Sequence, residues 1–197
     1  FDIRKTLIKF DDVMNDQRRV IFSQRLKILK SKNVEEILEE FLSEVLDNLV
    51  STKNIYQKSN DEKNYLTKIK NTIGNILSDE ELIMMASLNK DEFIEKLKGL
   101  YTKKRESRID LVGTEENNSL EKRIFLQIID FTWRSHLQYL EQLRQVIGLR
   151  QYGQKDPLSE FKKEAFNLFE ELLEKIKNDI IKFLLNLNIV ISDESKK

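Results

Sequence analysis

Few side chains in this sequence are spaced to do chemistry, and the first candidates are the neighbours Ser135 and His136. His136 is the only histidine in the 197 residues. Because adjacent residues of a helix point about 100° apart, the serine hydroxyl and the imidazole are poorly placed to act as nucleophile and base. We therefore interpret His136 as a histidine that packs in a helical hairpin or lies on the surface, and we identify no catalytic set.

Asp11, Asp12 and Asp16 are the second candidates, because carboxylates could bind a metal if further ligands converged on them. Salt bridges to Arg18 and Arg19, or helix capping, are the simpler interpretation. The sequence has no cysteine, which excludes a thiolate metal site, and a single histidine excludes a multi-histidine site. It also lacks the GxxxxGKS or GxxxxGKT loop that would cradle the phosphates of ATP.

Composition favours long helices and gives no global argument for nucleic-acid binding. The 34 basic and 34 acidic side chains balance, 35% of the residues are charged, and there is one proline. No apolar run approaches the roughly 20 residues that span a bilayer, and we find no signal peptide. Since the chain starts at Phe1, inside a periodic segment and without Met, we expect it to be a fragment of a longer protein.

Two periodic segments open the chain. Apolar residues recur at helical spacing over residues 1–30, which predicts a helix of about 28 residues with one buried stripe. Residues 31–33 interrupt it, and Asn33 with Glu36 has the spacing of a capping box that opens a second helix. We expect the polar residues 51–61 to form a loop.

Residues 52–112 predict a small helical subdomain, to which we assign no chemistry. Ser78 and Glu81 form a second potential capping box, and a further helix begins near Asn89. Gly113 then punctuates the chain before the periodic pattern resumes.

The last third of the chain predicts a long antiparallel helical hairpin. Helical spacing of apolar residues holds over 120–147 and again over 158–187, with only a short segment between them. Two helices of roughly 30 residues, each spanning about 45 Å, must then lie side by side. The fold class is therefore all-α. Trp133 lies on the apolar stripe, and we interpret it as packing between helices.

The tip of this hairpin reads GLRQYGQKDP, residues 148–157. Gly148 or Gly153 can adopt the left-handed conformation that ends a helix, while Asp156 is a good N-cap and Pro157 fits the first helical position. Tyr152 cannot enter the core of its own hairpin at such a tip. It either folds back on the loop or is displayed to a partner, for which tyrosine offers large contact area at low entropic cost.

Two segments resemble SecA, the family of bacterial protein-translocation ATPases. FDIRKTLIKFDDVMNDQR, residues 1–18, is similar to the family's helical-scaffold signature, with Ile8 and Phe10 in place of a usual leucine and tyrosine. TWRSHLQYLEQLRQVIGLRQYGQKDPLSEFKKEAFNLF, residues 132–169, is similar to its two-helix finger. In the finger, Gln151 replaces the glycine or small residue common at that position.

The resemblance implies a long scaffold helix, a small helical wing subdomain and a long helical hairpin. It implies a scaffold over 1–51 with a break near 31–33, a wing over 52–114, a finger over 115–190 with its tip at 148–157, and a polar tail over 191–197. The scaffold helix would pack along the nucleotide-binding and preprotein-binding domains of the parent. The residues expected on this interdomain face are Arg4, Asp11, Asp12, Asn15 and Arg18.

The same resemblance assigns partners to the hairpin. Its tip would enter the SecY channel and contact unfolded preprotein through Tyr152, with Arg150, Gln151, Gln154 and Lys155 around it. The finger of the family also regulates ATP hydrolysis, and Trp133, His136 and Arg144 match positions of its motif. Basic residues near the tip would suit acidic channel loops or an anionic membrane surface.

The chain would accordingly be a non-catalytic part of the motor, cytoplasmic and peripheral at the bacterial plasma membrane. ATP and magnesium would belong to motor domains outside this sequence, and so would the family's zinc-binding tail, so we expect no cofactor here. We also expect no nucleic-acid partner. The alternative is a stand-alone helical adaptor that binds partner helices.

Overall fold

The computed structural model describes residues 2–59, 61–153 and 156–190. Every regular element in these ranges is helical, which confirms the predicted all-α class. The elements are α1 (Asp2–Lys30), α2 (Glu35–Lys58), α3 (Glu62–Ile73), α4 (Asp79–Ser87), α5 (Lys90–Val112), α6 (Thr114–Ile147), the 3-10 helix η1 (Gly148–Gly153) and α7 (Pro157–Asn186).

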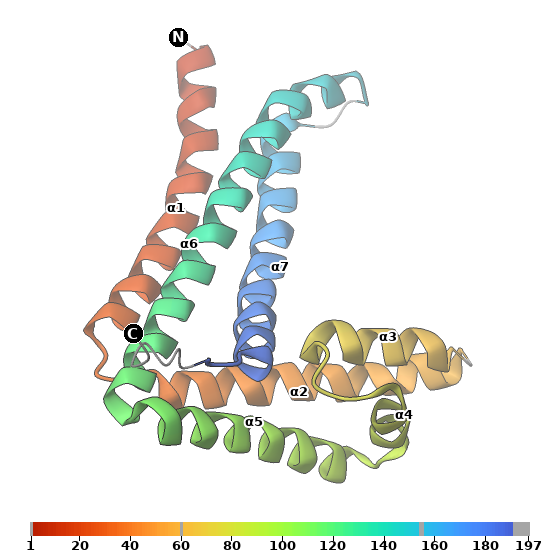
Figure 1. Cartoon of the computed structure of the whole chain (residues 1–197). Helices are drawn as coiled ribbons and strands as arrows, with labels where there is room; N and C mark the ends of the chain where they lie inside the picture. The colour runs from red at the N-terminus through yellow and green to blue at the C-terminus, as the bar shows by residue number, and fades with distance from the viewer. Residues whose placement is uncertain (1, 60, 154–155, 191–197) are drawn as a thin grey trace. The chain divides into compact units, whose positions relative to one another are not determined.

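These elements form two compact units (Figure 1). The first unit comprises residues 1–32 and 122–176, and the second comprises residues 33–121 and 177–197. Each unit thus takes part of α6 and part of α7. The domain boundaries expected from the resemblance stay a prediction, because they follow a family pattern and not the packing within this chain.

The first unit packs α1 against the hairpin of α6 and α7. Phe10 of α1 meets Phe161 of α7 edge to face, with ring centroids 4.9 Å apart. Around this pair a core of buried residues joins all three helices, and its other members are Leu140, Leu143, Ile147 and Ala165. Late residues of α6 pack on early residues of α7, so the two helices are antiparallel, as their matched apolar spacing predicted.

The hairpin turns through η1 without a left-handed glycine. Gly148 and Gly153 both lie in η1, and positive φ angles among the described glycines occur only at Gly74 and Gly113. The prediction of a left-handed glycine at the tip is therefore wrong, because a 3-10 turn tightens the end of α6 instead. The predicted start of α7 is confirmed: Asp156 Oδ2 accepts from the Ser159 amide at 3.1 Å, and the helix begins at Pro157.

In the second unit, α2 is longer and differently capped than predicted. Its N-cap is the buried Val34, and Asn33 Oδ1 accepts only from the Glu35 amide at 3.3 Å, so the Asn33–Glu36 capping box is wrong. The loop predicted over 51–61 is also largely wrong, since α2 continues to Lys58. The hydroxyls of Ser51 and Thr52 bond back to carbonyls of the preceding turn, at 2.8 Å each, and thus remain compatible with the helix.

The other helix ends of the second unit follow local chemistry closely. Ser78 and Glu81 form the predicted capping box of α4, and Asn89 caps α5 by accepting from the Glu92 amide. Gly74 ends α3 with a φ of 77°. An added Cβ there would collide with Asn186, which accepts from the Asn75 amide at 3.1 Å and donates to the Ile73 carbonyl at 2.8 Å. This glycine is therefore needed both for conformation and for space.

A cluster of buried ions holds α5 to the first turns of α6. Glu121, fully buried, accepts from Arg105 Nε at 2.9 Å, from Arg108 Nη2 at 3.2 Å and from Asn117 Nδ2 at 3.1 Å. Arg108 also donates to the Leu184 carbonyl at 3.1 Å. Each buried charge thus has an opposite charge and further hydrogen bonds, which is the condition for burying ions without a large penalty.

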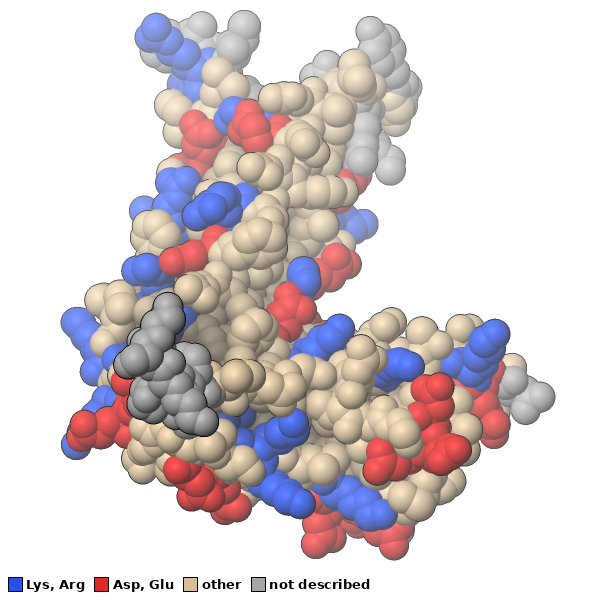
Figure 2. Space-filling model, viewed as in Figure 1, with Lys and Arg blue, Asp and Glu red and all other residues tan. Residues whose placement is uncertain are grey.

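Charges of both signs are interspersed on the molecular face drawn in Figure 2, with uncharged stretches between them. Within the described residues, no helix combines the length and the apolar character that crossing a membrane requires.

Candidate functional site: the first helix against the hairpin

A buried polar network joins α1 to both helices of the hairpin. Gln17 of α1 and His136 of α6 are only 8% and 7% exposed. Gln17 Oε1 lies 2.7 Å from His136 Nε2, and Gln17 Nε2 donates to the Ala165 carbonyl of α7 at 3.0 Å. One side chain of α1 therefore contacts both helices of the hairpin by hydrogen bonds.

The imidazole of His136 sits between two aromatic rings. The Trp133 ring lies 5.5 Å from it, centroid to centroid, and the Phe169 ring lies 5.9 Å from it. Burial lowers the pKa of His136 to about 4, so the ring is neutral at pH 7. Because Gln17 Oε1 can only accept, the neutral ring donates its Nε2–H to it. The Ser135 hydroxyl donates elsewhere, to the Phe131 carbonyl at 3.2 Å.

On either side of this network, ion pairs also link α1 to α6. Toward the tip, Arg144 donates to Asp11 of α1 at 2.8 Å and to Glu141 of its own helix at 2.8 Å. Toward the other end of α1, Arg25 forms a two-point ion pair with Asp130, at 2.9 and 3.2 Å. The ion pair with Asp130 raises the pKa of the Arg25 guanidinium.

The C-terminus of α1 is held by a lysine of α6. Lys122 Nζ donates to the Ser31 carbonyl at 2.8 Å and to the Leu29 carbonyl at 3.1 Å. A cation at this position satisfies carbonyls that the helix leaves open and complements the negative end of the helix dipole. Together with the ion pairs and Gln17, it ties α1 to α6 along most of the length of α1.

The five residues expected on the interdomain face have different surroundings in the structure, and their expected role stays a prediction. Asp11 contacts Arg144 of the hairpin, whereas Arg4 and Asp12 are exposed. Asn15 accepts from Arg18 at 3.0 Å within α1. The structure therefore brings one of these five to the hairpin and leaves the others on the surface of the unit.

The fingertip residues mostly fall outside the described part of the chain. The backbone of Arg150, Gln151 and Tyr152 belongs to η1, but their side chains are outside the description, as are Gln154 and Lys155 entirely. Their expected contacts stay predictions.

Gln17 is the residue of this network that sequence reasoning missed, although a signal for it exists. Among the described side chains of α1, the buried ones are Phe10, Gln17, Ile21 and Ile28, which share helical spacing. A glutamine at a position where apolar residues are expected needs a buried partner. The only histidine, His136, was the natural candidate.

Helix α1 also carries large apolar side chains that are exposed. Phe22 is 54% exposed and Ile8 is 58% exposed, and the others are Leu7, Val20, Leu26 and Leu29. A shallow groove is lined by Arg18, Arg19, Phe22 and Leu26. We call this set of exposed residues the outer face of α1. Exposed apolar surface of this kind is typical of interaction sites.

Comparison with known proteins places this arrangement in a family. A sequence profile described as the SecA Wing and Scaffold domain matches residues 1–188. The chain is 49% identical to the protein translocase subunit SecA of Pelagibacter ubique, over 96% of this chain and 22% of that protein. The corresponding subunits of Caulobacter vibrioides and Afipia carboxidovorans are 35% and 37% identical over 98% of this chain and 21% of each protein. The chain thus spans about a fifth of the length of the curated relatives it matches, and it belongs to the SecA wing and scaffold domain family.

Proposed function

We propose that this chain is the non-catalytic scaffold and two-helix-finger part of a protein-translocation motor. In this role it couples ATP-driven motion to the movement of preprotein through the SecY channel. Membership of the SecA wing and scaffold family supports the general role. The relatives that match nearly the whole of this chain carry the name protein translocase subunit. The motor would work in the cytoplasm, peripherally at the bacterial plasma membrane.

The observation that carries the proposal is the junction of α1 with the hairpin through Gln17. A hydrogen-bonded side chain that is buried between three helices resists sliding, because any slide would leave polar groups unpaired in a dry environment. The hairpin segment of the first unit, residues 122–147, spans about 39 Å at the rise of an α-helix. A displacement of α1 would therefore be passed to the hairpin and its tip.

The outer face of α1 is the surface through which motion would enter. Exposed Phe22 and Leu26 beside the basic Arg18 and Arg19 are suited to another protein domain. We assign this surface to the nucleotide-binding and preprotein-binding domains of the parent, which would hold ATP and magnesium. The chain itself would then need no cofactor and would hydrolyse no ATP.

The tip would be the surface through which motion leaves. Tyr152, with Arg150, Gln151, Gln154 and Lys155, would contact the translocating polypeptide or the mouth of the channel. A tyrosine suits this task because it makes large contacts without requiring a particular partner sequence. The basic members would favour acidic channel loops or anionic lipids.

A chimera tests the proposal. This chain would replace the matching segment of the Pelagibacter subunit, and a cysteine at position 152 would be cross-linked during transport. We expect cross-links to preprotein or channel that depend on ATP. Efficient transport without any such cross-link would contradict the fingertip role. Saturable ATP hydrolysis by the isolated chain would contradict the non-catalytic role.

The exposed apolar residues of α1 also fit a stand-alone helical adaptor, since such a protein would need the same kind of surface. The chimera separates the two functions. An adaptor would bind partner helices as an isolated chain, and it would fail to restore transport when placed inside the translocase.

A further inference from the structure

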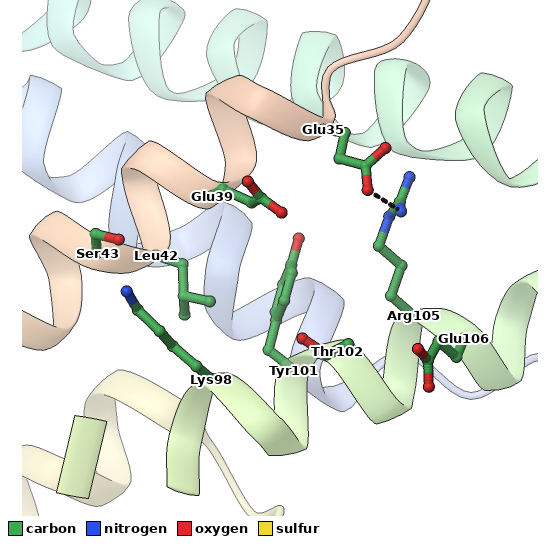
Figure 3. Close-up of a pocket in the computed structure, with 9 residues that line it drawn as sticks. All are labelled: Glu35, Glu39, Leu42, Ser43, Lys98, Tyr101, Thr102, Arg105 and Glu106. Atoms are coloured by element: carbon green, nitrogen blue, oxygen red, sulfur yellow. Dashed lines mark hydrogen bonds and ion pairs between the residues drawn. The ribbon is translucent and has the colours of Figure 1, made fainter. Parts of the chain in front are cut away.

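The second unit contains a cavity of about 400 Å³ between α2 and α5 (Figure 3). One wall comes from residues one and two turns apart on α2, namely Glu35, Glu39, Leu42 and Ser43. The other comes from the facing side of α5, where Lys98, Tyr101, Thr102, Arg105 and Glu106 recur at the same helical spacing. This volume lies within the usual range of small-ligand sites.

The tyrosine in this cavity has a hydroxyl with no partner. Tyr101 is only 4% exposed, and its hydroxyl is buried without a hydrogen bond. Burial, and then the charge of Glu121, raise the pKa of Tyr101, so the hydroxyl keeps its proton. Figure 3 shows it pointing toward the side of α2 that carries Glu35 and Glu39. Buried hydroxyls nearly always have partners, so this one indicates a missing ligand.

The charges around the hydroxyl select the sign of that ligand. The charge of Arg105 is already paired: Nη1 donates to Glu35 at 2.7 Å and Nε donates to Glu121 at 2.9 Å. Glu39, in contrast, forms no ion pair or hydrogen bond among the described residues, and Figure 3 shows its carboxylate facing the Tyr101 hydroxyl. Lys98 extends toward Ser43, away from this hydroxyl. An anion would therefore meet unpaired negative charge, whereas a cation would be stabilised.

The geometry favours an organic cation over a metal ion. Among the described residues, no three histidine, cysteine or acidic side chains are grouped to hold a metal. An alkylammonium group needs less convergence, because its three N–H donors can reach acceptors in different directions. Its carbon chain would lie against Leu42, which is 4% exposed, and against the Tyr101 ring, whose face also attracts a cation.

We propose that the cavity between α2 and α5 binds a primary alkylammonium group, with the Glu39 carboxylate and the Tyr101 hydroxyl as its acceptors. The ammonium could be supplied by a free small amine or by a lysine side chain. This inference concerns the second unit alone and does not rest on the proposed role of the hairpin.

The test uses the 197-residue chain with tyrosine rings labelled with carbon-13, observed by NMR. There are five tyrosines, and Tyr101→Phe identifies the Tyr101 signal. We expect n-butylammonium to shift this signal saturably and neutral n-butanol to leave it in place. Glu39→Gln should weaken binding by about tenfold, since the oxygen that accepts from the ammonium loses its negative charge.

Matched controls keep the inference falsifiable. Glu40→Gln alters the neighbouring exposed carboxylate, which does not line the cavity, and should leave the affinity unchanged. Tyr101→Phe should weaken binding of the amine, measured by isothermal titration calorimetry, while helix content stays the same. Tighter binding of putrescine would assign the site to a free amine, and tighter binding of lysine capped at both ends would assign it to a side chain. A response that does not saturate, an equal response to n-butanol, or saturable binding of phosphate instead would overturn the proposal.

Discussion

The two units bury polar side chains by opposite means. In the first unit, Gln17 and His136 are uncharged and bond to each other, and Gln17 also reaches a backbone carbonyl. In the second unit, Glu121 and Arg108 are buried as ions with several partners each. A neutral network needs only hydrogen bonds, whereas an ionic cluster also needs complete compensation of charge. The second should therefore be more costly to break, and the first should be more sensitive to acid.

The largest loss of stability is expected from a substitution of Glu121. Glu121→Gln keeps the shape of the side chain but leaves Arg105 and Arg108 without their shared buried counter-charge, which should lower the free energy of unfolding by about 3–5 kcal/mol. Urea unfolding followed by far-UV circular dichroism measures it. Glu115→Gln, on an exposed position of the same helix, should change stability by less than about 0.5 kcal/mol. A loss at Glu121 no larger than at Glu115 would mean that the ions do not depend on each other.

Acid should destabilise the first unit through His136. The pKa of His136 is about 4 in the folded chain against 6.5 for an ordinary histidine, so the unfolded chain takes up the proton first as the pH falls. The stability that neutral His136 contributes is fully present above pH 6.5. As the pH falls from 6.5 to 4, the free energy of unfolding should decrease by about 3 kcal/mol.

Carboxylates titrate in the same pH range, so the effect of His136 on stability must be separated from theirs by comparison with a variant that lacks the histidine. The free energy of unfolding of the parent minus that of His136→Phe should fall as the pH is lowered through this window. A difference that is independent of pH would show that His136 is not held neutral by burial.

A smaller loss is expected at Gln17. Gln17→Leu fits the apolar surroundings but leaves the buried Nε2–H of His136 without its acceptor, which should cost about 1–3 kcal/mol. Trp133, the only tryptophan and a neighbour of His136, reports the transition by fluorescence. Gln24→Leu, on an exposed position of α1, is the control. If both variants lower the free energy of unfolding by the same small amount, the network does not hold α1 to the hairpin.

The smallest effect is expected at the ion pair of Asp11 with Arg144. The side chains are 55% and 26% exposed, so solvent screens the pair. Asp11→Asn should lower the free energy of unfolding by about 0.5 kcal/mol. The loss should shrink as sodium chloride is added, because salt screens exposed charges. A loss as large as that of Gln17→Leu would reverse the expected order of the contacts.

Much of the first unit could be predicted from the sequence because its helices carry long, regular apolar stripes. The paired stripes of the hairpin and the Asp156–Pro157 start of α7 are local signals. The buried stripe predicted for α1 is confirmed only in part, since Phe10, Ile21 and Ile28 are buried whereas other apolar residues of this helix are exposed. Gln17 escaped prediction because its partner lies 119 positions away in the chain.

The second unit was harder to predict because distant contacts override local signals there. Residues 51–58 look like a loop by composition, yet they stay helical, and Tyr56 near the end of α2 packs on the Tyr65 ring 5.9 Å away. Arg105 and Glu121 meet only because the chain turns at Gly113, which has a φ of 88°. Spacing within one helix gives no sign of such a pair.

We propose that motion of α1 reaches the tip through the bonds of α1 to the hairpin. The most direct test measures preprotein transported per ATP hydrolysed, in the chimera with the Pelagibacter subunit, for Gln17→Leu and for the control Gln24→Leu. Unchanged helix content and Trp133 fluorescence would establish that both variants are folded. We predict that Gln17→Leu hydrolyses ATP while its transport per ATP falls severalfold and that of the control does not. Transport per ATP equal to the parent's in Gln17→Leu would contradict the claim.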